Sequence, residues 1–300
     1  MILVDPASWS WRGRLWAHLV SDTSYQELHE FAELLGIPRR AFQGDHYDVP
    51  SEYRERAIAL GARAVPSREL VGRLRSAGLR RRLPGTPVAR AWVAAVERLG
   101  GNAGAAARTS AELERRYREP HRHYHTNDHI RSVLVDADDL AEQVNVPGPD
   151  RAMLTLAVCA HDVVYDGLPG EDERASAAWV RLRLEECELP SSYGERVAAA
   201  VLATATHSHS QPDHDAVVEM LLDADLAILG APAHAYDRYV ADVRMEYSSL
   251  DDTAWRRGRA QVLENLAGRE SLFFTSAARA RWESAARANL ERELRSLKGS

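Results

Sequence analysis

The stretch MLTLAVCAHDVVYDG, residues 153–167, joins an apolar run to a histidine and an aspartate. The run predicts a segment buried in a core, because almost every residue from 153 to 160 is apolar. It ends on His161 and Asp162, which are costly to bury unless a partner replaces the water that they lose. A bound metal ion would be such a partner if other parts of the chain supplied further ligands.

The length and charge of the chain set the frame for this site. The 300 residues are long for one compact domain and favour two. The 38 Lys and Arg residues against 44 Asp and Glu residues give a net charge of −6. This balance favours solubility and gives no whole-chain case for binding nucleic acid or an anionic membrane.

The cysteines and the apolar segments bear on localisation. Cys159 and Cys187 lack the close spacing of a zinc finger or a redox pair, which is typical of a reducing compartment. The opening MILVDPASW does not resemble a signal peptide, and no later segment reaches the ~20 apolar residues that span a bilayer. We therefore expect a cytoplasmic protein without a membrane partner.

A cluster of charge, proline and glycine, GLRRRLPGTPVAR at residues 78–90, marks a change in the character of the chain. We place a linker at residues 83–86, between a domain at residues 1–82 and a second at residues 87–300. Strand-like and helix-like segments alternate in the first domain, which predicts a small α/β fold. The predicted strands are residues 1–6 and 62–65, and the predicted helices are residues 23–36, 51–61 and 67–78, with Ser51 and Ser67 as caps and Gly36 and Gly61 as ends.

After the linker, strand signals nearly vanish and apolar residues recur at helical spacing. The second domain is therefore predicted to be all-α. The clearest predicted helices cover residues 176–189, 196–207, 233–247 and 280–297.

Histidines and aspartates gather in this helical domain. The segment EPHRHYHTNDHI places histidines at 121, 123, 125 and 129, and His125 and His129 share a helix face because they are four residues apart. His161 and Asp162 follow, and Asp225 is embedded in the apolar segment MLLDADLAILG. A lone histidine near a core is more often hydrogen-bonded than metallated, but together these side chains favour a divalent metal site.

The ordered set YREPHRHYHTNDHI, CAHDVVYDG, EDERASA, ATATH, DADLAILG and VRMEYSSL resembles a bacterial branch of the HD superfamily of metal-dependent phosphohydrolases. The resemblance covers roughly residues 87–297 and implies an all-α HD-type domain. By position it implies four metal ligands, which are His129, His161, Asp162 and Asp225. Asp223 is the competitor for the last place, and the ADL context favours Asp225.

The resemblance implies a phosphohydrolase that cleaves a nucleotide or another small phosphomonoester with metal-activated water. The expected catalytic residues are His125 and Asp162. YHTNDH resembles the YHxxxH element of cyclic-nucleotide phosphodiesterases, in which the first histidine donates a proton, so His125 is the candidate acid. Those enzymes carry a further histidine where this chain has Tyr165, which makes a two-metal site less expected.

Four further side chains are expected to bind substrate, namely Arg122, His123, His207 and Glu173. Arg122 and His123 could meet phosphate oxygens, and the alternative for the arginine is a solvated surface residue. The acidic residues 171–173 have a simpler explanation, because negative charge is favourable at a helix N-terminus. Arg244 and Glu246 could line the pocket or form a structural pair, and we favour the structural pair. His209 and His214 are interpreted as exposed loop residues.

The first 82 residues resemble a small bacterial domain family of unknown function, through VDPASW, DHYDVP and GARAVPSREL. This segment holds 13 Arg against 10 Asp and Glu residues, a net charge of +3, which gives weak support for a nucleic-acid contact. Six side chains are candidates for a metal or phosphate site: Asp5, His18, Asp22, His29, His46 and Asp48. The alternative is that Asp22 caps a helix while His46 and Asp48 fix a turn.

Two other functions stay open beside the phosphohydrolase. One is a metal-stabilised sensor that binds a nucleotide without turnover, and the other is a nucleic-acid or protein adaptor that acts through the N-terminal domain. The spacing of the residues does not identify the metal, so Mn²⁺, Mg²⁺, Fe²⁺, Co²⁺, Ni²⁺ and Zn²⁺ all remain candidates. The expected partner is a small phosphorylated substrate, and the oligomeric state cannot be read from the sequence.

Overall fold

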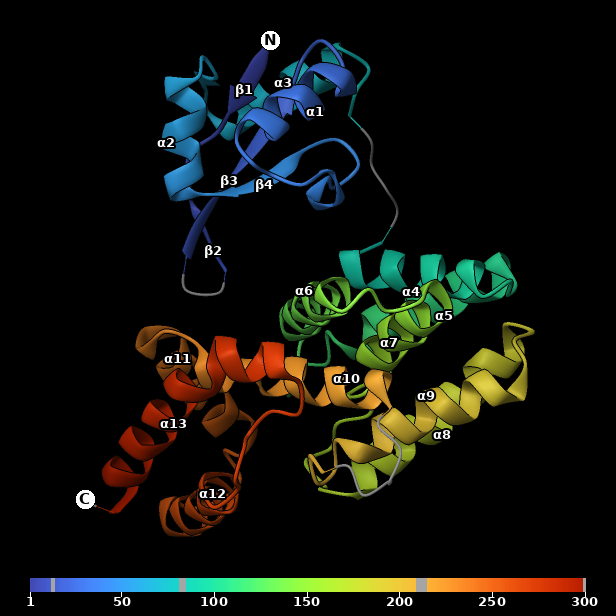
Figure 1. Cartoon of the computed structure of the whole chain (residues 1–300), viewed down its shortest axis with the longest axis vertical. Coiled ribbons are helices and arrows are strands. Elements are labelled where there is room, and N and C mark those ends of the chain that lie inside the picture. The colour runs from blue at the N-terminus through green and yellow to red at the C-terminus, as the bar shows by residue number, and fades with distance from the viewer. Residues whose placement is uncertain (12–13, 81–84, 209–214, 299–300) are drawn as a thin grey trace. The chain divides into compact units, whose positions relative to one another are not determined.

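A computed structural model describes residues 1–11, 14–80, 85–208 and 215–298 (Figure 1). The chain divides into two compact units, Met1–Pro84 and Gly85–Ser300. The first is a small α/β unit, and the regular elements in the described residues of the second are all helices, which confirms the predicted two-domain fold class. Within the described ranges, no helix combines the length and the apolar character that crossing a bilayer requires.

The N-terminal unit is built on a mixed sheet of five strands. Strand β3 is the longest and pairs antiparallel with β1, β2 and β4, whereas β5 pairs parallel with β1. Two predicted strands correspond to β1 and β5. The sequence patterns did not predict β2, β3 and β4, which lie between β1 and β5 in the sequence. The strands are β1 (Ile2–Val4), β2 (Trp9–Trp11), β3 (Arg14–Ser21), β4 (Tyr47–Pro50) and β5 (Arg63–Ala64).

The three predicted helices of this unit are present as α1 (Tyr25–Leu34), α2 (Ser51–Ala59) and α3 (Ser67–Ser76), and a short 3₁₀ turn η1 covers Arg39–Ala41. Two predicted caps are wrong. Ser51 and Ser67 are each the first helical residue, because Pro50 and Pro66 occupy the N-cap positions. The hydroxyl of Ser67 instead donates to Asp5 at 2.7 Å. Its role is thus to hold a buried carboxylate and not to start a helix.

The second unit packs ten α-helices and one 3₁₀ turn in its described residues. The predicted helical segments correspond to α8, α9, α11 and α13. The elements are α4 (Pro87–Arg98), α5 (Ala103–Arg116), α6 (Asn127–Gln143), α7 (Gly148–Ala160), α8 (Glu171–Glu186), α9 (Ser191–Ala203), α10 (Ala216–Leu226), η2 (Ala227–Gly230), α11 (Ala233–Glu246), α12 (Asp252–Ala267) and α13 (Ser276–Lys298).

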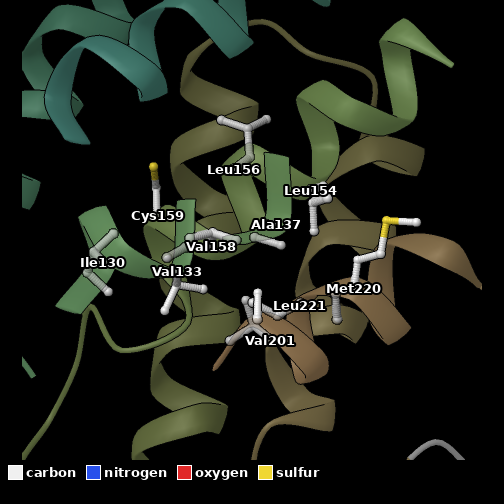
Figure 2. Close-up of a cluster of buried hydrophobic side chains, with 14 of the residues drawn as sticks. Ile130, Val133, Ala137, Leu154, Leu156, Val158, Cys159, Val201, Met220 and Leu221 are labelled. Carbon is white, nitrogen blue, oxygen red and sulfur yellow. The ribbon is translucent and has the colours of Figure 1, made fainter. Parts of the chain in front are cut away.

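Helix α7 lies at the centre of the helical core. Apart from Thr155, its residues from 152 to 160 are buried, so the helix is enclosed on nearly all sides. Figure 2 shows side chains of α7 among those of α6, α9 and α10, with Ile130, Val133, Val201 and Leu221 on the surrounding helices. This packing fixes the end of α7, where His161 and Asp162 follow.

Gly230, at the end of η2, lies directly against α13. A Cβ atom at this position would lie 2.7 Å from Cβ of Trp282 and 3.0 Å from its Cα and carbonyl oxygen. No side chain fits there without a shift of the backbone. The segment that follows Asp225 can therefore approach α13 closely because residue 230 is a glycine.

Candidate metal centre

Three core helices and the turn after α7 supply the predicted ligands of one site. His129 lies in the first turn of α6, His161 caps the end of α7 and Asp162 follows it, and Asp225 lies in the last turn of α10. Helices α6, α7 and α10 pack on one another, so their ends converge. The folded chain thus brings together side chains that are up to 96 residues apart (129 to 225) in the sequence.

The donor atoms of these side chains are close enough to share one ion. Nε2 of His129 lies 3.3 Å from Nε2 of His161, 3.3 Å from Oδ2 of Asp162 and 3.2 Å from Oδ1 of Asp225. Nε2 of His161 lies 2.9 and 3.4 Å from the same two oxygens. Two ligands with bonds of about 2.1 Å lie about 3.0 Å apart in cis octahedral geometry and about 3.4 Å apart in tetrahedral geometry. His129, His161 and Asp225 are therefore mutually close enough to hold a divalent first-row metal ion, and Asp162 contacts both imidazoles beside them.

A backbone contact orients one of the imidazoles for this role. Nδ1 of His161 lies 2.9 Å from the carbonyl oxygen of Val158, to which it donates. The proton on Nδ1 leaves the lone pair on Nε2, and this is the arrangement of most histidines that bind metals. The side chains of His129 and His161 are 3% and 0% exposed, against 17% and 15% for Asp162 and Asp225. Solvent therefore reaches the group from the side of the carboxylates.

The charges of the four groups stabilise one another. Although burial opposes the ionisation of Asp162 and Asp225, the facing imidazoles hold the pKa of each carboxyl well below its usual range. Burial likewise opposes the charged imidazoles, yet the two carboxylates raise the pKa of His129 and of His161. The site therefore favours a positive charge among its four donors, carried either by protons or by a cation.

Asp223 and Asp225 have different surroundings in the fold, although they are only two residues apart in the sequence. Asp225 faces the histidines, whereas Asp223 is completely buried and accepts hydrogen bonds from the backbone N–H groups of Phe274 and Thr275 and from the Thr275 hydroxyl, at 2.6 to 2.8 Å. Asp223 thus anchors the segment before α13. The geometry favours Asp225 as the fourth ligand.

His125 lies beside the ligands and is held by a carboxylate. Its Nδ1 lies 2.7 Å from Oε2 of Glu246, and its ring stacks on Tyr165 with the centroids 4.1 Å apart. The hydroxyl of Tyr165 donates to the same oxygen at 3.0 Å. Tyr165 thus supports His125 and offers no histidine-like ligand for a second metal. Since Nδ1 is occupied, Nε2 of His125 is the nitrogen available to a substrate.

Glu246 also fixes the backbone around His125. Its Oε1 accepts hydrogen bonds from the N–H groups of His123, Tyr124 and His125 at 2.7, 2.7 and 2.9 Å. Burial opposes its ionisation, but the hydrogen bond from the His125 ring and those from the backbone lower the pKa of Glu246 to about 2. Glu246 is therefore an ionised anchor of the histidine segment.

Two of the predicted substrate-binding residues lie away from the open side of the site. The side chain of Arg122 is 0% exposed, and its guanidinium donates to the carbonyl groups of His125, Asp162 and Val163. Arg122 thus ties the histidine segment to the turn after α7, instead of meeting a phosphate as we expected. His123 is exposed and does not line the cavity described below.

The other two predicted residues do reach the open side. Nε2 of His207 lies 2.8 Å from Oδ2 of Asp225, so this histidine contacts a ligand carboxylate. Glu173 lines the cavity, but one of its oxygens accepts the N–H of Gly170 at 2.6 Å, which closes the first turn of α8. His209 and His214 lie outside the described residues.

A cavity of about 710 Å³ opens on the ligand group. Helix α12 forms part of its wall through Ala254, Gly258 and Val262, which are four residues apart and share one helix face. Aromatic rings form another part. Those rings belong to Tyr124, Tyr165, Tyr239, Tyr247 and Trp255.

Two arginines line the cavity and differ in their partners. Arg259 is paired with Glu293, from which its guanidinium lies 2.8 and 3.1 Å away. Arg269 donates to the carbonyl groups of Thr206 and His207 at 2.8 and 2.7 Å. Arg269 therefore keeps an uncompensated positive charge among its described contacts, and it is a candidate anion-binding residue. No sequence motif singled it out.

The sequence also did not predict the contact of Glu246 with His125, because Glu246 and Arg244 were both interpreted as structural. The guanidinium of Arg244 does pair with Asp252 at 2.9 Å and with two backbone carbonyls near the start of α12. Glu246, two residues on, instead holds His125. Only the segment VRMEY as a whole marked this position, and nothing in it distinguished the two roles.

Two of the six N-terminal candidates have structural roles, and the other four form a group. Asp22 pairs with Arg73 at 3.3 Å and does not cap a helix, because Ser24 is the N-cap of α1. His29 lies 2.7 Å from the Tyr47 hydroxyl, which makes it part of the packing. The remaining four, which are Asp5, His18, His46 and Asp48, lie together.

Residues 2–77 match a family model described as Protein of unknown function (DUF4031). This match confirms that the N-terminal segment resembles a domain family of unknown function. It does not extend into the helical unit. No curated protein and no solved structure matches the chain at a significant level.

Proposed function

We propose that the helical unit is a metal-dependent phosphohydrolase that cleaves a small phosphate ester. The observation that carries the proposal is the convergence of His129, His161 and Asp225 at the mouth of a cavity, with donor atoms 3.2 to 3.4 Å apart. Oδ2 of Asp162 adds a contact of 3.3 Å to Nε2 of His129 and one of 2.9 Å to Nε2 of His161. His129, His161, Asp162 and Asp225 would hold the ion. A divalent cation supplies a bound water that ionises near neutral pH and a positive charge for the phosphoryl oxygens.

His125 is the proposed proton donor for the leaving oxygen. Proton transfer from a positioned side chain contributes to such reactions, and the donor must keep its orientation through the transition state. The contact of Nδ1 with Glu246 and the stacking on Tyr165 provide that orientation. Arg122 supports the same geometry, because its guanidinium donates to the carbonyl groups of both His125 and Asp162.

The size and lining of the cavity favour a nucleotide within the class of phosphate esters. Ligand sites in proteins commonly enclose about 300–1,000 Å³, and aromatic rings provide stacking surfaces for bases. The volume of about 710 Å³ lies within that range, and Tyr247 and Trp255 face each other with centroids 5.7 Å apart. Arg269 would then bind a phosphate oxygen.

Metal analysis combined with phosphate release tests the proposal. The purified chain is expected to hold a divalent metal and to release phosphate from one or more members of a panel of nucleotides and sugar phosphates. Asp162→Ala should lose the phosphate release and the metal that the helical unit holds. Asp166→Asn is the matched control, because Asp166 is exposed on the same turn and does not line the cavity.

The possible outcomes separate the candidate functions. Full metal content and full activity in Asp162→Ala would overturn the proposed site. If the protein binds metal and binds a nucleotide tightly but releases no phosphate, it is a nucleotide-binding sensor and not a phosphohydrolase.

A further inference from the structure

A second group of potential metal ligands lies in the N-terminal unit. His18, His46 and Asp48 each offer one ligand atom, and these three atoms lie within 4.8 Å of one another. The strand geometry explains the grouping. His18 on β3 is the register partner of Asp48 on β4, so their side chains share a face of the sheet. His46 stands two residues before Asp48, and side chains two apart on an extended chain point the same way.

Each of the two imidazoles is oriented by a buried carboxylate. Nδ1 of His18 lies 2.9 Å from Oδ2 of Asp5, and Nδ1 of His46 lies 2.6 Å from Oδ1 of Asp45. Asp5 and Asp45 are only 1% and 2% exposed. Such carboxylate–histidine pairs fix the proton on Nδ1 and direct the lone pair of Nε2 to a metal.

Both carboxylates are themselves held in place. Asp5 accepts hydrogen bonds from the Ser67 hydroxyl at 2.7 Å and from the His18 N–H at 2.6 Å. Asp45 pairs with Arg80 at 2.8 Å. The supporting contacts thus come from three separate parts of the unit, which is more organisation than His46 and Asp48 would require if they only fixed a turn.

The Nε2 atoms of both rings lie near the same oxygen. Oδ1 of Asp48 lies 3.3 Å from Nε2 of His46 and 3.9 Å from Nε2 of His18. Ligands of a tetrahedral ion with bonds of about 2.1 Å lie about 3.4 Å apart, so only a small side-chain adjustment is needed. The side chains of His18, His46 and Asp48 are 38%, 21% and 12% exposed, which leaves the group open to solvent.

We propose that His18, His46 and Asp48 bind a first-row divalent transition metal ion. Two imidazoles and one carboxylate favour an ion such as Zn²⁺ or Co²⁺ over Mg²⁺ or Ca²⁺, which prefer all-oxygen sites. Three protein ligands leave a position for water or for an anionic ligand. This site is independent of the phosphohydrolase proposed for the helical unit.

Cobalt titration of the full chain tests the proposal. The starting protein carries Asp162→Asn and Asp225→Asn, so that the helical unit cannot supply its own site, and it is stripped of metal with a chelator. Added Co²⁺ is expected to produce visible d–d absorption that saturates at one equivalent. Adding His18→Gln should weaken Co²⁺ binding at least 100-fold, and Asp48→Asn should do the same. His29→Gln, which replaces a histidine of the same unit outside the group, should leave the titration unchanged.

The proposal fails if the starting protein shows no saturable cobalt spectrum, or if neither His18→Gln nor Asp48→Asn changes it. Thermal unfolding of each variant checks that it is folded. His18 is the most exposed of the three ligands, so His18→Gln keeps the test decisive if Asp48→Asn fails to fold. Phosphate release is not measured here, so failure of this site and failure of the phosphohydrolase remain distinguishable.

Discussion

Oε2 of Glu246 lies 2.7 Å from Nδ1 of His125, although 121 residues separate them in the sequence. The contact joins the end of α11 to the segment that leads into α6. It makes the orientation of His125 depend on how α11 packs. If His125 is the proton donor, Glu246 is its positioning residue.

Replacement of these two residues should separate proton transfer from metal binding. We expect His125→Ala to lower kcat by about 10²- to 10⁴-fold, the usual contribution of a general acid, while the metal content stays unchanged. Glu246→Gln should lower kcat less and leave KM nearly unchanged, because the ring remains present but loses its ionic anchor. Steady-state kinetics with metal analysis measures both effects. An unchanged kcat in His125→Ala would remove this residue from the mechanism.

Glu246 should also make stability depend on pH. Its pKa of about 2 in the folded chain lies below the ordinary value of 4.5, so the ionised group stabilises the fold above pH 4.5 and loses this effect as the pH falls toward 2. The shift corresponds to at most about 3 kcal/mol. Urea unfolding of the wild type and of Glu246→Gln at pH 5, 4 and 3 should show a difference that shrinks with falling pH. A constant difference would contradict this assignment.

Asp223 and Asp225 offer a matched pair of substitutions. Asp225→Asn should remove the metal held by the helical unit and abolish activity, because it removes a ligand charge. Asp223→Asn should keep the metal and lower the free energy of unfolding by about 1–3 kcal/mol, since a buried acceptor of three hydrogen bonds is altered. Metal analysis and chemical unfolding of both variants provide the check. Metal loss in Asp223→Asn alone would reverse the assignment of the two residues.

Arg269 should affect substrate binding more than turnover. Loss of a charge-assisted hydrogen bond to phosphate in Arg269→Gln is expected to raise KM by about 10- to 100-fold. Arg279→Gln is the matched control, because Arg279 also donates to two backbone carbonyls but does not line the cavity. Equal KM changes in the two variants would point to loop packing instead of phosphate binding.

Replacement by alanine should lower the stability of the chain at Gly230 and raise it at Gly258. Gly230→Ala places a methyl group 2.7 Å from Trp282 and should destabilise the chain by about 1–3 kcal/mol. Gly258 lies within α12 with no atom within 4 Å of an added Cβ, so Gly258→Ala should stabilise the helix by about 0.5–1 kcal/mol. Thermal unfolding compares the two, and a similar loss of stability in both would contradict the close approach at Gly230.

The sequence predicted the parts of this molecule that local patterns determine. Helical spacing of apolar residues predicted α8, α9, α11 and α13, and the alternation of patterns predicted the two-domain fold class. The strands β2, β3 and β4 were missed, because their pairing joins segments that carry no helix-like or uniformly apolar signal. Ser51 and Ser67 were misread as caps because the preceding prolines take that position.

The candidate site shows the same limit. The four ligands could be proposed because each is a chemically distinctive residue in an apolar or histidine-rich segment. The partners that orient His125 could not, since Glu246 and Tyr165 reach it only through the packing of α11 and the turn after α7. The histidines around Arg122 in the sequence suggested that it binds phosphate. Its burial and its hydrogen bonds to backbone carbonyls, which the sequence does not show, indicate a structural role.

Helix α12 lines the cavity with Ala254, Gly258 and Val262 and also with the larger Trp255, Arg259, Asn265 and Leu266, and it carries none of the four candidate ligands. Changes on this helix would reshape the chamber without disturbing the reactive groups. For the proposed phosphohydrolase, substrate selectivity could thus change through α12 while the metal ligands stay the same.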